Sequence, residues 1–399
     1  MSVSEQSKYL ISNYGPPPLE IVKGEGSYLW DSSGKKFLDF TSGIAVTNIG
    51  HSHQHWIDSV SKQAKQLVHC SNLYSIPQQI NLAKRLIAHI GPGKMLFCNS
   101  GAEANEALIK FARLTGNQVP GPKKHKLIVA ENAFHGRTMG ALSATSSSKY
   151  RNGFEPLLDG FSFAPLNDLA AFKSKIDEQT IGIMVESIQG EGGIQVASDS
   201  FLQGLQEICL EKNLLFMLDE VQAGIGRTGE FLGFQKSGVK PDAVAMAKGL
   251  GGGFPIGGIW LKEKWTEIFQ PGSHGTTFGG SPLACSAAHA VLDVIEKEDL
   301  IKKTQKHGEF LQSELENLKN KYPNLIKEVR GRGLMLALVM QNLPNDLITK
   351  LRQKGLLVVG AAGNAIRFLP PLTICNSELK EALEITKSSL KEFHHELQK

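Results

Sequence analysis

The sequence of 399 residues has few cysteines, and their arrangement argues against a disulfide-stapled protein. The five are odd in number, lie far apart and form no Cys-x-x-Cys pair: Cys70, Cys98, Cys209, Cys285 and Cys375. Secreted domains that depend on disulfides use an even number of cysteines at short spacings. We therefore expect no disulfide framework and a reducing compartment.

Long apolar runs and one-sided charge are also missing. No run reaches the roughly 20 apolar residues that a membrane-spanning helix needs. The first 15 residues lack the basic and apolar segments of a signal peptide and the arginine bias of a transit peptide. The 43 Lys and Arg nearly balance the 39 Asp and Glu, for a net charge of +4 without a basic cluster. These absences predict a cytoplasmic protein that binds neither membrane nor nucleic acid.

What the chain does contain is a series of short apolar runs separated by helical patterns. Its length favours two packed units. The runs that read as buried strands are Met95–Cys98, Leu127–Ala130, Ile181–Val185, Leu214–Leu218, Ala243–Ala247 and Ile256–Leu261. Helix-period segments, Ala102–Leu114 and Phe201–Glu211, lie between them. This alternation is typical of a parallel sheet covered by helices on both faces.

The two ends of the chain have a different pattern. Residues 19–45 alternate turn residues with short strand-like pieces. After residue 290 come a long charged helical pattern (Val291–Lys319), strands near Gly333–Met340 and Ala365–Leu369, and an amphipathic helix from Ser377. We expect residues 50–285 to form a large α/β domain, and residues 1–49 and 286–399 to build a smaller α+β domain.

Three segments carry residues suited to chemistry. At Ser100-Gly101-Ala102 an apolar run meets a helical pattern, so free amides and the helix dipole could bind a phosphate. Asp219 ends an apolar strand where open α/β sheets bind ligands, and a buried carboxylate there could keep a pyridine nitrogen protonated. Lys248 also ends an apolar run, where desolvation would give a neutral, nucleophilic amine. Each has a plain alternative: a helix start, a capping Asp and a lysine emerging to solvent.

Two other patterns suggest different chemistry. His51, His53 and His55 alternate as zinc ligands can, but no cysteine or carboxylate nearby completes a set. Gly224-x-Gly226-x-x-Gly229 has the letters of a dinucleotide fingerprint, but it lies late in the chain and no clean helix follows it. We expect neither a metal site nor NAD binding.

The order of the motifs is more specific than any one of them. N-S-G-A-E-A-N-E, F-H-G-R-T, E-S-I-Q-G-E-G-G, L-D-E-V-Q-A-G-I-G-R-T-G, A-K-G-L-G-G-G-F-P-I-G and H-G-T-T-F-G-G-S-P follow one another. Together they resemble the class III (subgroup II) aminotransferases of fold type I, from about Tyr14 to Leu372. The resemblance implies the PLP-dependent transferase fold, with a large mostly parallel sheet covered by helices plus a smaller α+β domain. It also implies pyridoxal 5'-phosphate (PLP) as cofactor.

The resemblance further implies roles for individual residues around PLP. Lys248 would form the Schiff base and carry the proton between substrate and cofactor, and Asp219 would pair with the pyridine nitrogen. Six more positions would bind the cofactor: Ser100, Gly101 and Ala102 at its phosphate, Phe134 on its ring, Gln222 near its phenolic oxygen and Thr277 at the phosphate of the neighbouring subunit. The role of Thr277 implies an obligate homodimer with shared active sites.

The substrate side is expected to recognise carboxylates. Arg137, next to the ring-stacking segment, suits bidentate binding of a carboxylate, with a structural ion pair as the alternative. Glu191 and Arg367 resemble a family pair in which the arginine binds the α-carboxylate of 2-oxoglutarate and the glutamate masks it while the amino donor is bound. Thr276 and Tyr14 resemble further substrate-side positions.

Within the family, the chain most resembles members that act on N2-acetyl-L-ornithine. The implied reaction moves its δ-amino group to 2-oxoglutarate, a step of arginine biosynthesis. Ornithine, succinylornithine, succinyldiaminopimelate or 4-aminobutyrate as donor, and a PLP-binding protein without turnover, stay open. Ser281 and Gln54 depart from the usual asparagine and proline at their positions.

Overall fold

The structure, a computed structural model, describes residues 8–118, 121–343 and 345–398, and its largest element is a seven-stranded sheet. The strand order is β4-β12-β11-β10-β7-β5-β6. The strands are β4 (Gly93–Cys98), β5 (Lys126–Ala130), β6 (Phe161–Ala164), β7 (Thr180–Glu186), β10 (Leu215–Asp219), β11 (Ala243–Met246) and β12 (Gly257–Lys262). β12 runs antiparallel to both its neighbours, and the other pairs are parallel. The mostly parallel sheet is confirmed, and β6 is the strand that the sequence reading missed.

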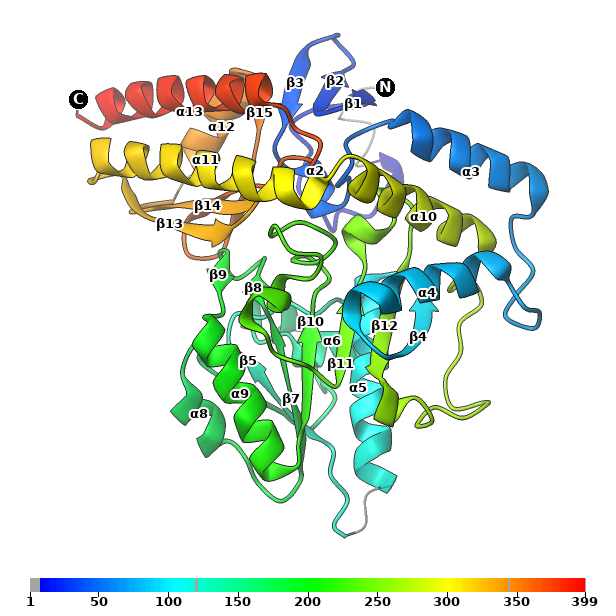
Figure 1. The fold of residues 1–399 in the computed structure, drawn as a ribbon. Coiled ribbons are helices and arrows are strands. Elements are labelled where there is room, and N and C mark those ends of the chain that lie inside the picture. The colour runs from blue at the N-terminus through cyan, green and yellow to red at the C-terminus, as the bar shows by residue number, and fades with distance from the viewer. Residues whose placement is uncertain (1–7, 119–120, 344, 399) are drawn as a thin grey trace.

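Helices cover both faces of this sheet. Met217 and Ala245 face a buried cluster that includes residues of α5 (Gly101–Gln118). Their neighbours Phe216 and Val244 face the opposite cluster, which contains residues of α9 (Asp199–Lys212). The short helix α8 (Leu169–Ser174) packs beside α9 (Figure 1). Because side chains alternate across a strand and both faces are dry, the central strands are apolar at nearly every position.

Two four-stranded sheets lie together in the upper part of Figure 1 with the helices α11 (Leu300–Lys321) and α13 (Asn376–Leu397). The first, in the order β1-β2-β3-β15, combines segments from both ends of the chain, and the second has the order β13-β14-β17-β16. Their strands are β1 (Ile21–Glu25), β2 (Tyr28–Asp31), β3 (Lys36–Asp39), β13 (Ile326–Arg332), β14 (Met335–Met340), β15 (Leu356–Leu357), β16 (Val359–Ala361) and β17 (Ala365–Phe368). The domain boundaries after residues 49 and 285 stay a prediction, and the second falls within helix α10.

The remaining elements are short or lie around the sheets. They are α2 (Ser42–Ala45), α3 (Gln54–Gln66), α4 (Pro77–Ile90), α6 (Met139–Ala144), α7 (Ser148–Arg151), α10 (Pro282–Lys297), α11 (Leu300–Lys321), α12 (Asn345–Gln353), α13 (Asn376–Leu397), β8 (Ile188–Gln189), β9 (Gln195–Val196) and the 3-10 turns η1 (Gly233–Ser237), η2 (Lys248–Leu250) and η3 (Glu263–Trp265). Among the described residues, no helix is both long and apolar enough to cross a membrane.

The helical pattern predicted at Val291–Lys319 is divided between two helices. The helical conformation is interrupted at Asp299, whose φ of 51° lies in the left-handed region, and α11 starts at the next residue. The first helix, α10, begins well before the predicted start, at Pro282. Its N-cap is Ser281, whose hydroxyl accepts a hydrogen bond from the Ala284 amide. Ser281, which departs from the asparagine usual in the family, therefore serves as the N-cap of α10.

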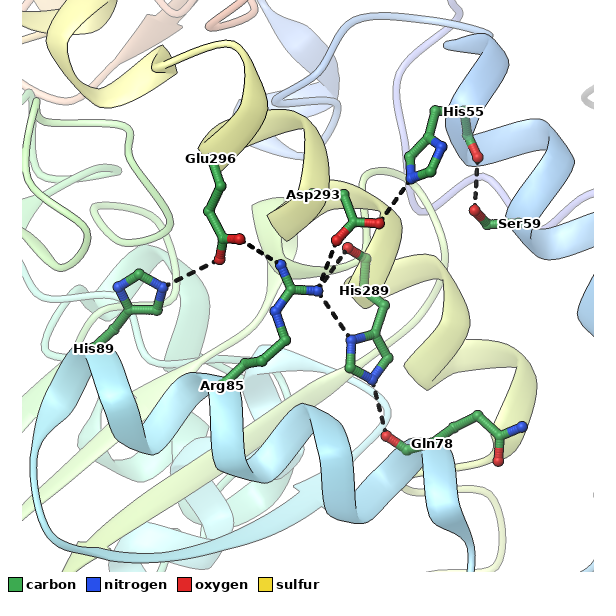
Figure 2. A network of polar contacts seen from close by, with 8 residues as sticks. All are labelled: His55, Ser59, Gln78, Arg85, His89, His289, Asp293 and Glu296. Carbon is green, nitrogen blue, oxygen red and sulfur yellow. Dashed lines mark hydrogen bonds and ion pairs between the residues drawn. The ribbon is translucent and has the colours of Figure 1, made fainter.

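A network of polar contacts links α3 and α4 to α10 (Figure 2). The guanidinium of Arg85 donates to Asp293 and to Glu296, each at 2.9 Å. His55 contacts the other oxygen of Asp293 at 2.8 Å, and His289 accepts from Arg85 at 3.1 Å. Arg85 of α4 and His55 of α3 thus meet at Asp293 and join both helices to α10, which lies far along the chain.

Candidate active site

The residues proposed for chemistry meet at one edge of the seven-stranded sheet. Asp219 is the last residue of β10, Lys248 opens the turn after β11, and Gly101 opens α5 just after β4. Because these strands run the same way, their carboxyl ends share the edge at which open α/β sheets bind ligands. A cavity of about 230 Å³ lies here. Its lining includes eight of the residues expected from the sequence: Gly101, Ala102, Phe134, Arg137, Glu191, Asp219, Gln222 and Lys248.

Asp219 is buried and held by three donors. One oxygen, Oδ2, accepts from the Asn105 amide and contacts Nδ1 of His135, both at 2.7 Å. The other, Oδ1, accepts from the Val221 amide at 2.9 Å. Because Nδ1 of His135 faces a carboxylate, it carries the ring proton. The buried Nε2 of the same ring has no partner among the described residues. The carboxylate is thereby fixed in position at the cavity wall.

Lys248 has a half-buried side chain whose amine has no bonded partner. Burial lowers the pKa of its ammonium, and the nearby carboxylates of Glu191 and Asp219 oppose that shift. Within the described residues, its amine makes no hydrogen bond or ion pair, although it lines the cavity. Its φ of 44° is unusual for a residue with a side chain and marks the tight turn that ends β11. The amine is positioned for chemistry rather than for an ion pair.

Two further carboxyl groups lie buried beside Asp219. Glu186 on β7 is in register with Asp219, and burial together with the charge of Asp219 raises its pKa well above the usual value. Glu220 follows Asp219 but accepts from the Gly233 amide at 2.7 Å, outside the cavity lining. Burial raises the pKa of Glu220 to about 7. The carboxyl groups of Glu186 and Asp219 therefore line the cavity, whereas that of Glu220 is bonded outside it.

Glu191 and Arg367 form an ion pair at the cavity. Nη1 and Nη2 of Arg367 donate to the two carboxylate oxygens of Glu191 at 2.5 and 3.2 Å. The Arg367 side chain is 1% exposed and that of Glu191 is 21% exposed. Burial alone would raise the pKa of Glu191, but the charge and hydrogen bonds of Arg367, with smaller contributions from Lys248 and Gln222, together lower it. Gln222 bridges the pair, accepting from Arg367 at 3.3 Å.

The N-terminus of α5 offers an anion site that is lined by glycines. The Ser100 hydroxyl accepts from the Glu103 amide at 3.1 Å, while the amides of Gly101 and Ala102 have no intrahelical acceptor. A Cβ at Gly101 would lie 2.5 Å from a methyl of Val221, and one at Gly136 would lie 2.8 Å from Cβ of Ala102. Only glycine at both positions lets the neighbouring segments approach the helix start this closely.

Five of the expected residues lie outside the cavity lining: Tyr14, Ser100, Thr276, Thr277 and Arg367. Tyr14 is 80% exposed, and Thr277 is exposed as well. The Thr276 hydroxyl accepts from the Asn99 side chain at 3.2 Å, next to Ser100. Arg137 does line the cavity: its guanidinium lies 4.3 Å from the centre of the Tyr150 ring and forms no ion pair among the described residues.

Four lining residues were not singled out from the sequence: Asn105, His135, Gly136 and Val221. Asn105 lies one helical turn after Gly101, so its side chain returns to the same end of α5. His135 directly follows Phe134, and Glu186 ends an apolar strand as Asp219 does. The sequence left Glu186 open between a pocket-lining and a structural role, and the structure places it in the lining.

The three alternating histidines do not converge. His51 contacts Asp39 at 2.9 Å, His53 contacts Glu298 at 3.5 Å and His55 contacts Asp293 at 2.8 Å. The described residues contain no group of three or more metal-ligating side chains that could hold a metal ion. Each histidine instead links a different pair of elements.

The comparisons with known proteins agree with this geometry. A family model described as aminotransferase class-III matches residues 9–390. The chain belongs to the class-III aminotransferases. Among curated class-III relatives, acetylornithine aminotransferases of Caldanaerobacter subterraneus and Aquifex aeolicus are 46% and 47% identical to it. The alignments cover 98% and 96% of this chain and 99% and 100% of the relatives.

Solved structures of class-III aminotransferases give the same result for the fold. An ornithine aminotransferase from Toxoplasma gondii is 31% identical, with a TM-score of 0.95 over 99% of this chain and 96% of that one. An acetylornithine aminotransferase from Elizabethkingia anophelis is 34% identical, with a TM-score of 0.87 over 98% of both chains. Another structure of the Toxoplasma enzyme is described with PLP at the active site. The fold is that of the PLP-dependent transferases, and the protein is an aminotransferase that uses PLP.

The cavity residues fit this cofactor. An amine without a bonded partner, a fixed carboxylate and a glycine-lined helix start match an aldehyde, a pyridine nitrogen and a phosphate, respectively. All three groups line one cavity. Which residue contacts which atom of PLP stays a prediction.

Proposed function

We propose that this aminotransferase moves the δ-amino group of N2-acetyl-L-ornithine to 2-oxoglutarate. The products are N-acetyl-L-glutamate 5-semialdehyde and L-glutamate, a reaction of arginine biosynthesis. Support for the donor comes from near-full-length relatives at 46–47% identity that are named acetylornithine aminotransferases. Support for a dicarboxylate acceptor comes from the buried Glu191–Arg367 pair beside Lys248, and that pair carries the proposal.

The chemistry divides between cofactor and protein. When bound, PLP supplies an aldehyde that takes up the amino group and a ring that withdraws electrons from the substrate carbon. Lys248 holds PLP and then, as a neutral amine, moves a proton at Nζ from and to that carbon. Asp219 favours a protonated ring nitrogen, because a fixed negative charge stabilises a nearby positive one. Gly101 and Ala102 bind the phosphate, with Ser100 setting the helix start.

To bind two substrates that carry different charges, the site needs a positive charge that can be neutralised when the amino donor is bound. With the amino donor bound, Glu191 neutralises Arg367, so a donor without a carboxylate at that position meets no unpaired arginine. With 2-oxoglutarate bound, Arg367 is released to bind the α-carboxylate as a bidentate partner. Arg137 offers a second carboxylate site on the other substrate arm, with Thr276 and Tyr14 as further contacts. Phe134 and Gln222 complete the cofactor side, covering the ring and approaching its phenolic oxygen.

Donor preference is the direct test of the reaction. With 2-oxoglutarate as acceptor, kcat/KM should be highest for N-acetylornithine, above N-succinylornithine, N-succinyldiaminopimelate, ornithine and 4-aminobutyrate. We expect a margin over free ornithine of at least about tenfold, or about 1.4 kcal/mol of transition-state binding. A higher kcat/KM for ornithine would favour the activity named for the Toxoplasma relative and contradict the donor proposed here.

We further propose a cytoplasmic homodimer whose subunits share active sites. Thr277 is exposed and absent from the lining of its own cavity. Beside it, a surface cavity of about 680 Å³ is lined by Thr276 and by apolar residues of α4 and β4, among them Ile80, Ile87 and Met95. Apolar surface of this kind commonly packs against another chain. A second copy there would bring Thr277 to the phosphate of its partner.

Mixing a variant impaired in PLP binding with a variant that lacks turnover tests the sharing. Thr277→Ala should weaken PLP binding, and Lys248→Ala should remove turnover. If Thr277 serves the neighbouring subunit, heterodimers of the two variants contain one site with both residues intact. Activity should then return after joint unfolding and refolding, to about a quarter of wild type for random pairing of equal amounts. A mixture no more active than its components would rule out sharing through Thr277, as would a monomer in analytical ultracentrifugation.

A further inference from the structure

A second cavity lies directly beside the active site. It has a volume of about 410 Å³ and shares Glu191 with the first cavity. One wall comes from the segments after β5, including Lys149 and Tyr150, and the other from the β16–β17 turn, including Asn364. Glu191 thus lies between the site of chemistry and an adjoining polar space.

Of the two members of the ion pair, Arg367 is the fixed one. It lies on β17, and besides Glu191 its guanidinium donates to the Gly360 carbonyl at 3.2 Å and to Gln222 at 3.3 Å. Its side chain is almost fully buried. When a substrate carboxylate binds Arg367, the side chain that gives way must therefore be Glu191.

Glu191 has the freedom to turn without moving the chain. Its carbonyl accepts from the Ala362 amide at 3.1 Å, which anchors the backbone. It lies between Gly190 and Gly192, whose missing side chains leave its own side chain uncrowded by sequence neighbours. Rotation about side-chain bonds takes its carboxylate from one cavity it lines to the other.

The displaced carboxylate needs a new partner. Left beside an incoming dicarboxylate, its charge would repel the ligand and weaken binding. Lys149 lines the second cavity, is exposed and forms no ion pair within the described part of the chain. Its ammonium lies 5.9 Å from the centre of the Tyr150 ring, and no carboxylate among the described residues neutralises it.

We propose that Lys149 receives the Glu191 carboxylate when the acceptor's carboxylate binds Arg367. Lys149 is then a positioning residue: it acts on the acceptor through Glu191 and stabilises the open state of the pair. The inference rests on the proposed exchange at Glu191 and Arg367, and it adds where the glutamate goes and what holds it there.

Removing the charge of Lys149 should weaken acceptor binding selectively. In Lys149→Met, the KM for 2-oxoglutarate and the Kd of the PLP-loaded protein for glutarate should each rise about threefold, the scale of a partly exposed ion pair. The kcat/KM for N-acetylornithine should change less, because the donor leaves Glu191 on Arg367. Lys149→Arg should restore the wild-type values, and Lys62→Met on exposed α3 is the matched control. Equal effects on donor and acceptor, or none, would overturn the proposal.

The double variant separates action through Glu191 from direct contact. In a Glu191→Ala background, Lys149→Met should have no effect on glutarate binding, since no carboxylate remains to be received. A persisting threefold loss would mean that Lys149 binds the ligand itself, which refutes the proposal. Arg367→Ala reports on the underlying function: a large rise in the KM for 2-oxoglutarate without any Lys149 effect overturns this inference alone. No change in Arg367→Ala overturns both.

Discussion

Replacing Lys248 by alanine should abolish turnover and covalent attachment of PLP together. Loss of the amine removes both the anchor and the proton carrier, and the proton-transfer role alone is worth about 10²- to 10⁴-fold. We expect kcat to fall by at least about 10⁴-fold, since both roles are lost. After borohydride treatment, mass spectrometry should find PLP on a Lys248 peptide of the wild type and on no peptide of Lys248→Ala.

A second lysine of the same sheet provides the control. Lys262 also ends a strand, but β12 runs antiparallel, so its end lies at the opposite edge from the cavity. Lys262→Ala should keep both the label and the activity. A Lys248→Ala protein that still turns over at the wild-type rate, or that still retains PLP after borohydride and denaturation, would show that the anchor lies elsewhere.

Replacing Asp219 by asparagine should preserve the shape of the site and remove its charge. The asparagine can still accept from one of the donors Asn105 and His135, so the fold should persist. Without the carboxylate, the ring nitrogen loses the charge that favours its proton, and kcat should fall by about 10²- to 10³-fold, the cost of deleting one preorganised electrostatic contact. Stopped-flow measurement of the donor half-reaction would report this loss directly.

The adjacent carboxyl group is the matched control for Asp219. Glu220 is equally buried, bonds to the Gly233 amide away from the cavity and has a pKa raised to about 7. It is therefore partly protonated near neutral pH, and an amide is a close mimic of its neutral form. Glu220→Gln should keep turnover near that of the wild type. If Glu220→Gln and Asp219→Asn lost activity equally, the effect would come from general damage to the strand end.

The large sheet could be predicted because its strands are buried on both faces. Six apolar runs were sufficient to place six strands, whereas Phe161–Ala164 at the sheet edge is short, contains Ser162 and was missed. The pattern from Val291 to Lys319 read as one helix because its apolar period runs through the break. Asp299 adopts its left-handed conformation without a glycine to signal it.

The site was predictable where a residue ends a strand or begins a helix. Lys248, Asp219 and Gly101 follow that rule, and they line one cavity. Asn105 and His135 hold Asp219 from a helix and a loop, and no local pattern reveals a contact between segments so far apart. The second cavity depends on the approach of the β16–β17 turn, which only the folded chain brings into place.

The first sheet of the chain has a consequence for its synthesis. Strand β3 pairs with β15 through Leu38 and Leu356, and the side chain of Tyr28 donates to Glu381 on the last helix at 2.8 Å. At about 5 to 20 residues per second, the ribosome delivers these partners tens of seconds after the N-terminal strands emerge. Throughout that interval the edge of β3 has no strand to pair with. The segment made first is completed last, and the nascent chain must keep it from pairing with another molecule until the end is made.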